Sequence, residues 1–436
     1  MSDAGLFGVE EGRVSKGQSK HAVGRVRVQR AERHQVELRA SSLDEELPDE
    51  HRARVIWDSL EDLDLRAFYE PVGSREGGAG RPAIDPRILV ALWLYATSEG
   101  VGSARELERL CSLHAAYRWM CGGVSVNYHT LSDFRVGHER ALDELMTQIL
   151  GALMSEGLLR LRRVAQDGMR VRGHAGAASY RRGPSLKECL REARKQVQAV
   201  KKQLGNESGR TLERHQAAKL RAAKEREARV RKALRKLEEI NDGKSKKAAA
   251  ETRVSTTDPE CPVMKMADGG WRPAWNIQLA TDVESRTIVG VRVTARGNDM
   301  GQVEPMLEQI GRRTEKLPKE LLVDGGYAKL ESIERAAQAG VAVYAPPLKQ
   351  KRSDNDPTIP KKTDPPGVAR WRQRMRSKCG KAIYKDRATI AERTNADLRS
   401  WRGLDRISVK GASKALCVTL WSVLAFNLMR LVELTT

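Results

Sequence analysis

Two aspartates occupy comparable places in the sequence, each in a strand-like segment and each followed by glycine. Asp324 follows three apolar residues, 321–323, and precedes two glycines, whereas Asp167 lies in the segment 161–173 and precedes one glycine. An acid in such a place is commonly a cap or turn residue. Alternatively, it binds a ligand at the end of the strand, where glycine allows a bulky partner to approach the backbone. The residues alone leave both interpretations open.

Glu392 is a third candidate acid, in a C-terminal segment of helical character. Helical spacing places Arg399, seven residues later, on the same face. Three carboxylates from separate parts of a chain are often structural, as caps or ion-pair partners, but they also converge on hard divalent cations, which prefer oxygen ligands. The sequence contains no His/Cys spacing of a soft-metal site, no phosphate-binding glycine loop and no nucleophile elbow. The sequence therefore gives no support for a soft-metal site or a serine nucleophile, and it leaves both explanations of the three acids open.

The charge of the chain indicates a polyanionic partner. Its 436 residues include 78 Lys and Arg against 57 Asp and Glu, which gives a net charge of +21 and favours nucleic acid over an anionic membrane. Polar residues interrupt the most apolar run, 415–431, which predicts a buried helix rather than a membrane span. Six scattered cysteines without a Cys-x-x-Cys pair indicate a reducing compartment. We therefore expect a cytoplasmic, nucleoid-associated protein that does not enter a membrane.

Three regions follow one another along the chain. Residues 1–45 are polar and basic, and they predict a flexible arm. Residues 46–160 have apolar residues at helical spacing, which predicts an all-helical domain of about five helices for DNA binding or dimerisation. Residues 161–436 alternate strand-like and helical segments, which predicts an α/β domain around a mixed sheet.

A long charged insertion, residues 184–250, interrupts the predicted α/β domain. Apolar residues recur at steps of four and three in its first half, the segment GNESG (205–209) breaks the pattern, and a second apolar stripe follows. This pattern predicts an antiparallel helical hairpin whose outer faces are rich in Arg and Lys. Such a hairpin is either a solvated spacer or a basic arm that lies along a phosphate backbone.

With these segments in this order, residues 45–436 resemble bacterial insertion-sequence transposases of the DDE class. The resemblance rests on GRPAIDPRILVALWLYATSEGVGSARELERLCSLHAAYRWMCGG and NYHTLSDFR in the helical region, and on AQDGMRV, WNIQLATD, LLVDGGY and YKDRATIAE after it. It implies a helical N-terminal module followed by a catalytic domain of ribonuclease-H-like fold.

The resemblance also implies roles for single residues. Three match the family's catalytic and metal-binding acids: Asp167, Asp324 and Glu392. Three more match residues that accompany the glutamate and bind DNA: Tyr384, Arg387 and Arg399. In this family the acids hold two Mg²⁺ or Mn²⁺ ions, which activate water or a DNA 3′-hydroxyl and stabilise the leaving oxygen. The chain departs from the pattern twice: four residues rather than three separate Arg387 from Glu392, and Arg399 stands where lysine is more usual.

The expected function is that of a DNA transposase, which acts as a homodimer on double-stranded DNA at transposon ends and target. A ribonuclease-H-like nuclease without strand transfer is one alternative. A DNA-binding protein or repressor derived from a transposase, with unused acids, is another. Asp282 and Asp299 stay open, since each is either close to the site or part of a turn.

Overall fold

The computed structural model describes residues 40–74, 82–204, 210–348 and 356–435. Residues 43–436 form one compact unit. The arm predicted for residues 1–45 lies almost wholly outside the described residues, so its flexibility stays a prediction.

The N-terminal region is all-helical, as predicted. Its described residues form seven helices rather than about five: α1 (Arg52–Ser59), α2 (Arg66–Tyr69), α3 (Pro86–Ser98), α4 (Ala104–Leu113), α5 (Ala115–Cys121), α6 (Tyr128–Gly137) and α7 (Glu139–Ser155). The count differs because short elements are hard to separate in a sequence: only the extended backbone of His114 divides α4 from α5. Apolar residues surround α3 on all sides, so this helix is buried over almost its whole length.

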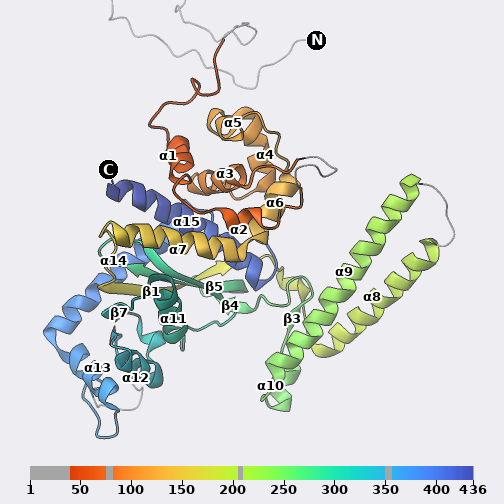
Figure 1. Cartoon of the computed structure of the whole chain (residues 1–436). Coiled ribbons are helices and arrows are strands. Elements are labelled where there is room, and N and C mark those ends of the chain that lie inside the picture. Colours follow the sequence, from red (N-terminus) through yellow and green to blue (C-terminus); the bar gives the residue numbers. More distant parts are fainter. Residues whose placement is uncertain (1–39, 75–81, 205–209, 349–355, 436) are drawn as a thin grey trace, which may run out of the picture. The chain divides into compact units, whose positions relative to one another are not determined.

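The C-terminal helix α15 (Ala412–Thr435) connects the helical region to the sheet. It packs against α3, α6 and α7 and also against strand β6 (Ile288–Thr294) (Figure 1). By length and composition residues 412–434 pass for a membrane span, yet 72% of the most apolar window is buried inside the protein. The buried helix predicted at 415–431 is therefore confirmed. One hydrophobic core runs through both regions, so position 160 marks a change of secondary structure within one compact unit.

A mixed sheet follows the helical region, as predicted. Its strands are β1 (Arg163–Arg172), β4 (Val263–Lys265), β5 (Trp271–Asp282), β6, β7 (Glu320–Leu322) and β8 (Ala342–Tyr344). One edge of β5 pairs with β4 and β6, and its other edge pairs with β1, followed by β7 and β8. The partners of β5 run antiparallel to it, whereas β1, β7 and β8 are mutually parallel. This mixed order agrees with the expected ribonuclease-H-like fold.

Four helices accompany the sheet: α11 (Val303–Thr314), α12 (Leu330–Gln338), α13 (Pro366–Arg376) and α14 (Lys378–Ser400). Helix α14 crosses β1, β5 and β8. A tight corner sets its start, because a Cβ atom on Gly380 would lie 2.0 Å from the carbonyl oxygen of Arg374. Only glycine fits there, and the corner aims α14 along β1.

The charged insertion forms the predicted helical hairpin. Its helices are α8 (Gly183–Leu204), α9 (Arg210–Asn241) and the short α10 (Lys246–Glu251), and the pair β2 (Tyr180–Arg181) and β3 (Val254–Ser255) lies at its base. Helices α8 and α9 run side by side (Figure 1). The buried members of the predicted apolar stripes include Leu186 and Val197 on α8 and Val230 and Leu237 on α9. The segment 205–209, where the break was predicted, lies outside the described residues.

Candidate active site

Asp167 and Asp324 lie at the same place along two neighbouring parallel strands. The pairs between β1 and β7 are Arg163↔Glu320, Val164↔Leu321 and Ala165↔Leu322. Two further steps in this register bring Asp167 opposite Asp324. The described pairing of β1 with β7 ends two residues before the acids. On the other side of β7, the backbone N–H of Val323 donates to the carbonyl oxygen of Tyr344 at 3.0 Å. The two acids therefore stand beyond the last paired residues of the two strands.

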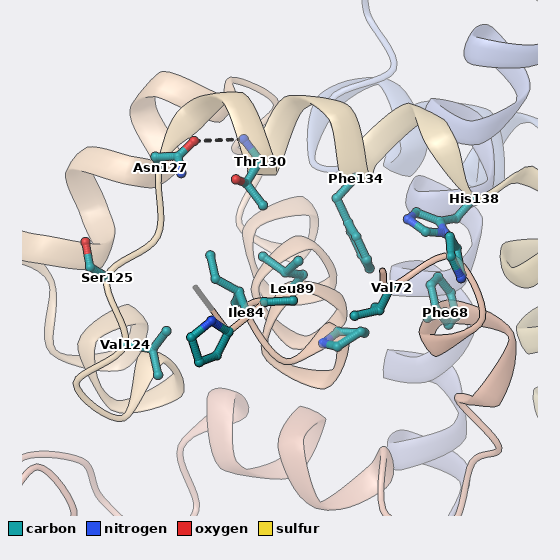
Figure 2. Close-up of a pocket in the computed structure, with 14 residues that line it drawn as sticks. Phe68, Val72, Ile84, Leu89, Val124, Ser125, Asn127, Thr130, Phe134 and His138 are labelled. Atoms are coloured by element: carbon teal, nitrogen blue, oxygen red, sulfur yellow. Dashed lines mark hydrogen bonds between the residues drawn. The ribbon is translucent and has the colours of Figure 1, made fainter. Parts of the chain in front are cut away.

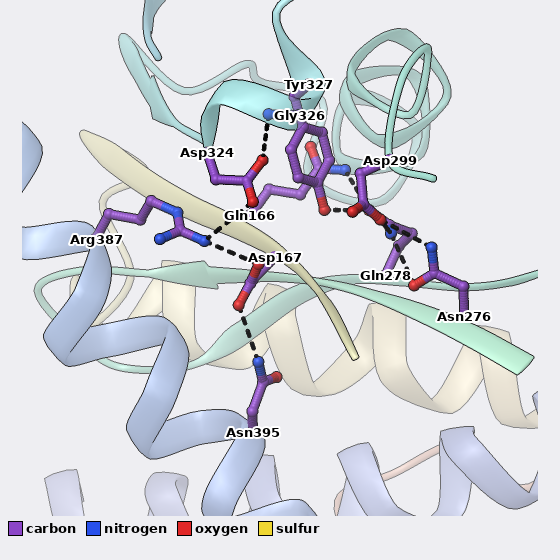
Figure 3. Close-up of polar contacts among 10 residues, drawn as sticks. All are labelled: Gln166, Asp167, Asn276, Gln278, Asp299, Asp324, Gly326, Tyr327, Arg387 and Asn395. Carbon is purple, nitrogen blue, oxygen red and sulfur yellow. Dashed lines mark hydrogen bonds and ion pairs between the residues drawn. The ribbon is translucent and has the colours of Figure 1, made fainter. Parts of the chain in front are cut away.

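One arginine joins the two acids. Nη2 of Arg387 lies 2.9 Å from Oδ1 of Asp167 and 3.9 Å from Oδ2 of Asp324 (Figure 3). Asn395, two turns further along α14, donates from Nδ2 to the other oxygen of Asp167 at 3.1 Å. Helix α14 is also tied to the beginning of β1, where Arg163 forms an ion pair with Asp386 at 2.6 Å. These contacts fix α14 over the carboxylates.

Burial changes the ionisation of this cluster. It raises the pKa of Asp167 above its ordinary value, and nearby Asp324 raises it further, although the guanidinium of Arg387 acts in the opposite direction. The pKa of Asp167 is therefore higher in the folded than in the unfolded protein. The contribution of this carboxyl to the free energy of unfolding is largest below its unfolded pKa and is lost as the pH rises through its folded pKa. Burial also raises the pKa of Tyr384, and the positive charge of Arg387 counteracts that rise.

Asp324 is a capping residue and a pocket residue at once. Its Oδ1 accepts a 2.7 Å hydrogen bond from the backbone N–H of Gly326, which caps the short 3₁₀ turn Gly325–Tyr327. A Cβ atom on Gly326 would lie 3.0 Å from that same oxygen, so the second glycine allows the acid to fold back on its own turn. The capping interpretation is therefore confirmed, and the side chain still faces the pocket, with 41% of it exposed.

A charged cavity of about 510 Å³ opens in front of the acids. Its acidic lining residues are Asp167, Asp268, Asp299, Asp324 and Asp405, and its basic ones are Arg170, Arg172, Arg272 and Arg399. Nη2 of Arg399 donates to the carbonyl oxygen of Arg170 at 3.1 Å, which holds this arginine at the wall. Carboxylates beside guanidinium groups suit a phosphodiester together with cations.

Glu392 is not part of this cluster. Residues of α14 spaced by multiples of four contact β1, namely Arg387, Asn395 and Arg399. Glu392 lies on the flank of the helix, is exposed, and is absent from the described lining of the cavity. In the part of the chain that the structure describes, no three His, Cys, Asp or Glu side chains are placed to hold a metal ion. The structure thus brings together Asp167, Asp324, Tyr384 and Arg387, and the role of Glu392 stays a prediction.

Asn395 and Asp299 are site residues that the sequence did not identify with certainty. Asn395 follows Arg387 by eight residues, or about two turns of α14, and the sequence analysis did not name it. Asp299 accepts hydrogen bonds from two side-chain amides beside Asp167. By contrast, Asp282 accepts from the backbone and the hydroxyl of Ser285, both at 2.8 Å, which confirms its turn interpretation.

The donor set of the two paired acids fits a hard divalent cation. Asp167 and Asp324 present carboxylate oxygens, which Mg²⁺ and Mn²⁺ prefer. Both acids already share one positive group, since Arg387 lies between them. Positive charge is therefore favourable between the two acids.

A second hollow, of about 630 Å³, lies in the helical region and differs in chemistry. Phe68, Ile84, Leu89, Val124 and Phe134 give it apolar walls (Figure 2). None of the described residues around it is acidic. The described residues therefore offer no carboxylate for a hard divalent cation there.

Two family models match the chain. The model "Transposase domain (DUF772)" matches residues 41–137, and the model "Transposase DDE domain" matches residues 251–428. The chain is a transposase with an N-terminal transposase domain and a DDE catalytic domain. The second match contains Asp324 and the whole of α14, and it begins after β1 and the hairpin. No curated protein and no solved structure matches the chain.

The two matches confirm the resemblance to transposases and the general properties that it implies. A transposase binds DNA, and DDE transposases generally use divalent metal ions. The mixed sheet after an all-helical region is consistent with the ribonuclease-H-like DDE domain.

Proposed function

We propose that this transposase cuts the ends of an insertion sequence and joins them to target DNA, by phosphodiester hydrolysis and strand transfer in the cavity of Asp167 and Asp324. The observation that supports this most is the convergence of the two acids on Arg387 beyond the last paired residues of two parallel strands. Four arginines line the same cavity, where a DNA backbone would need positive charge.

In this proposal Asp167, Asp324 and Glu392 hold two Mg²⁺ or Mn²⁺ ions. Such ions activate water or a 3′-hydroxyl for in-line attack and neutralise the leaving oxygen. The protein's own residues orient the acids: Asn395 and Arg387 each hold one oxygen of Asp167. Tyr384, Arg387 and Arg399 bind the DNA backbone in this proposal.

Replacing Glu392 tests the third acid. Because its side chain is exposed, Glu392→Gln should leave the melting temperature unchanged, and the proposal expects loss of DNA cutting. The matched substitution is Asp299→Asn, which alters another acid of the same cavity. Cutting assays on both variants show whether Glu392 or Asp299 is needed for the reaction. Retained cutting in Glu392→Gln with loss in Asp299→Asn would show that Asp299 is the third acid.

The helical hairpin is proposed as a basic arm on DNA. Three exposed lysines of α8 are suited to test it: Lys187, Lys195 and Lys202. Changing all three to Gln should lower the slope of log affinity against log salt by about 0.9 for each lysine that contacts a phosphate. The control changes three exposed lysines elsewhere: Lys316, Lys319 and Lys361. If the hairpin is only a spacer, the α8 variant will keep the wild-type slope.

Transfer of a pre-cut end into plasmid DNA tests strand transfer itself. The protein is incubated with Mg²⁺, a supercoiled plasmid and a labelled duplex that ends at the element's own 3′-hydroxyl. Label covalently joined to the plasmid supports the transposase, whereas nicking alone supports a nuclease. Tight binding of the ends without cutting would support the repressor. The position of Glu392 outside the described lining of the cavity favours this alternative.

We propose further that the protein acts as a homodimer, since two element ends must be held together, and that it works in the cytoplasm on the nucleoid. The net charge of +21 agrees with a DNA-bound location.

A further inference from the structure

A buried polar network joins the turn that bears Asp324 to the strand that bears Asp167 (Figure 3). The hydroxyl of Tyr327 donates to Oε1 of Gln278 at 2.6 Å. Nε2 of Gln166, the neighbour of Asp167, donates to the same oxygen at 3.1 Å. One glutamine side chain on β5 thus connects the segments of both acids.

This connection spans the place where the backbone pairing has ended. The last pair of the parallel ladder between β1 and β7 is Ala165↔Leu322, two residues before each acid. Tyr327 lies three residues after Asp324, and its ring is fully buried. Beyond the ladder, the contacts through Gln278 therefore tie the Asp324 turn to β1.

Asp299 fixes the orientation of this glutamine. Its Oδ1 accepts from Nε2 of Gln278 at 2.6 Å and from Nδ2 of Asn276 at 2.8 Å. With its nitrogen bound to Asp299, Gln278 must present its oxygen to Tyr327. The amides of Asn276 and Gln278 are fully buried, and an unpaired polar group there would cost stability.

Gly168 shows how closely this network approaches β1. A Cβ atom on Gly168 would lie 2.4 Å from Oδ1 of Asp299 and 2.5 Å from Nε2 of Gln278. Both distances are far below van der Waals contact, so any larger residue next to Asp167 would displace the network. The close approach of Asp299 and Gln278 therefore explains why glycine follows Asp167.

We propose that Tyr327, Gln278 and Asp299 are positioning residues that set the spacing between Asp167 and Asp324, and with it the affinity of this pair for a divalent cation. The inference rests on the proposed function, because it concerns the same pair of acids. None of the three needs to touch the DNA or the cation in order to act.

The test measures Mn²⁺ binding to the full chain without DNA, by electron paramagnetic resonance of the free ion. Tyr327→Phe should raise the dissociation constant about 10-fold or more, the usual effect of losing a group that orients a metal ligand. The matched control is Tyr180→Phe, which removes another buried hydroxyl that donates to the carbonyl oxygen of Cys261 at 2.5 Å, outside the cavity. The control should bind Mn²⁺ like the wild type, even if both variants melt at a similarly lowered temperature.

Two substitutions of Asp299 separate position from charge. Asp299→Asn keeps a side-chain oxygen for the amides, so its Mn²⁺ affinity should stay within about threefold of the wild type. Asp299→Ala removes the acceptor and should resemble Tyr327→Phe. Equal losses in Asp299→Asn and Asp299→Ala would overturn the positioning role, because the charge of Asp299 would then act on the ion directly.

The variant Asp167→Asn separates failure of this inference from failure of the proposed function. If the wild type binds Mn²⁺, Asp167→Asn abolishes the binding and Tyr327→Phe binds normally, the positioning role is wrong and the cation site stands. If Asp167→Asn binds as the wild type does, the cation site itself is wrong, and the inference falls with it.

Discussion

Asp167→Asn should reduce the rate of DNA cutting and joining by about 10³-fold or more, the scale of losing one charged group that stabilises a transition state. At neutral pH the same variant loses the ion pair between Asp167 and Arg387, but it also removes a buried carboxylate whose pKa burial raises. Because these two effects oppose each other, its melting temperature should stay close to that of the wild type. An acid that serves catalysis rather than stability would show this combination. Cutting assays and thermal unfolding on one preparation measure both effects.

Asp282→Asn is the matched control for that substitution. Asp282 also lies in the sheet with a raised pKa from burial, but its partner is Ser285 and it is not among the described lining of the cavity. This variant should cut DNA at the wild-type rate. A comparable loss of activity in both variants would mean that Asp167 acts through the fold rather than through the chemistry.

Arg387→Met should lower the stability of the folded protein. It leaves Asp167 and Asp324 side by side without the positive group that now lies between them. Breaking a half-buried ion pair from one side should lower the free energy of unfolding by about 2 kcal/mol, less than for a fully buried pair because Asp324 is partly solvated. Saturating Mg²⁺ should restore most of this loss, since a cation then replaces the missing charge. Chemical denaturation with and without Mg²⁺ measures the difference.

Arg163→Met is the control for Arg387→Met. Arg163 lies at the start of β1, the strand that carries Asp167. Arg163 is similarly buried and bridges Glu320 and Asp386, at 2.6 Å each. This variant should also have a lower free energy of unfolding than the wild type. Mg²⁺ should raise that free energy by no more than it raises the value of the wild type. If Mg²⁺ rescues both variants equally, the cation does not bind between Asp167 and Asp324.

The sequence predicted the elements with strong periodicity. The hairpin repeat in α8 and α9 and the apolar run of α15 lead directly to the helices observed. Strands β2, β3 and β4 contain two or three residues each, which is too short for an alternating pattern to predict them. The two aspartates were found because an acid followed by glycine, within or directly after a strand-like segment, is a local pattern.

Other parts of the site depend on contacts between distant segments. The network of Gln278, Asp299 and Tyr327 connects three segments that have no common motif. The face that α14 turns toward β1 depends on the corner at Gly380 and on the ion pair between Arg163 and Asp386. The resemblance placed both Arg387 and Glu392 beside the other acids, and the structure places Arg387 there together with Asn395, which the sequence analysis did not name.

The most direct test of the central claim uses a labelled duplex that carries the element's own end, with Mg²⁺ and either the wild type or Asp324→Asn. Asp324 lies within the matched DDE domain, caps its own turn and faces the cavity opposite Asp167. We expect metal-dependent cutting by the wild type, and binding without cutting by Asp324→Asn. Cutting by Asp324→Asn at the wild-type rate would show that the chemistry takes place elsewhere in the protein.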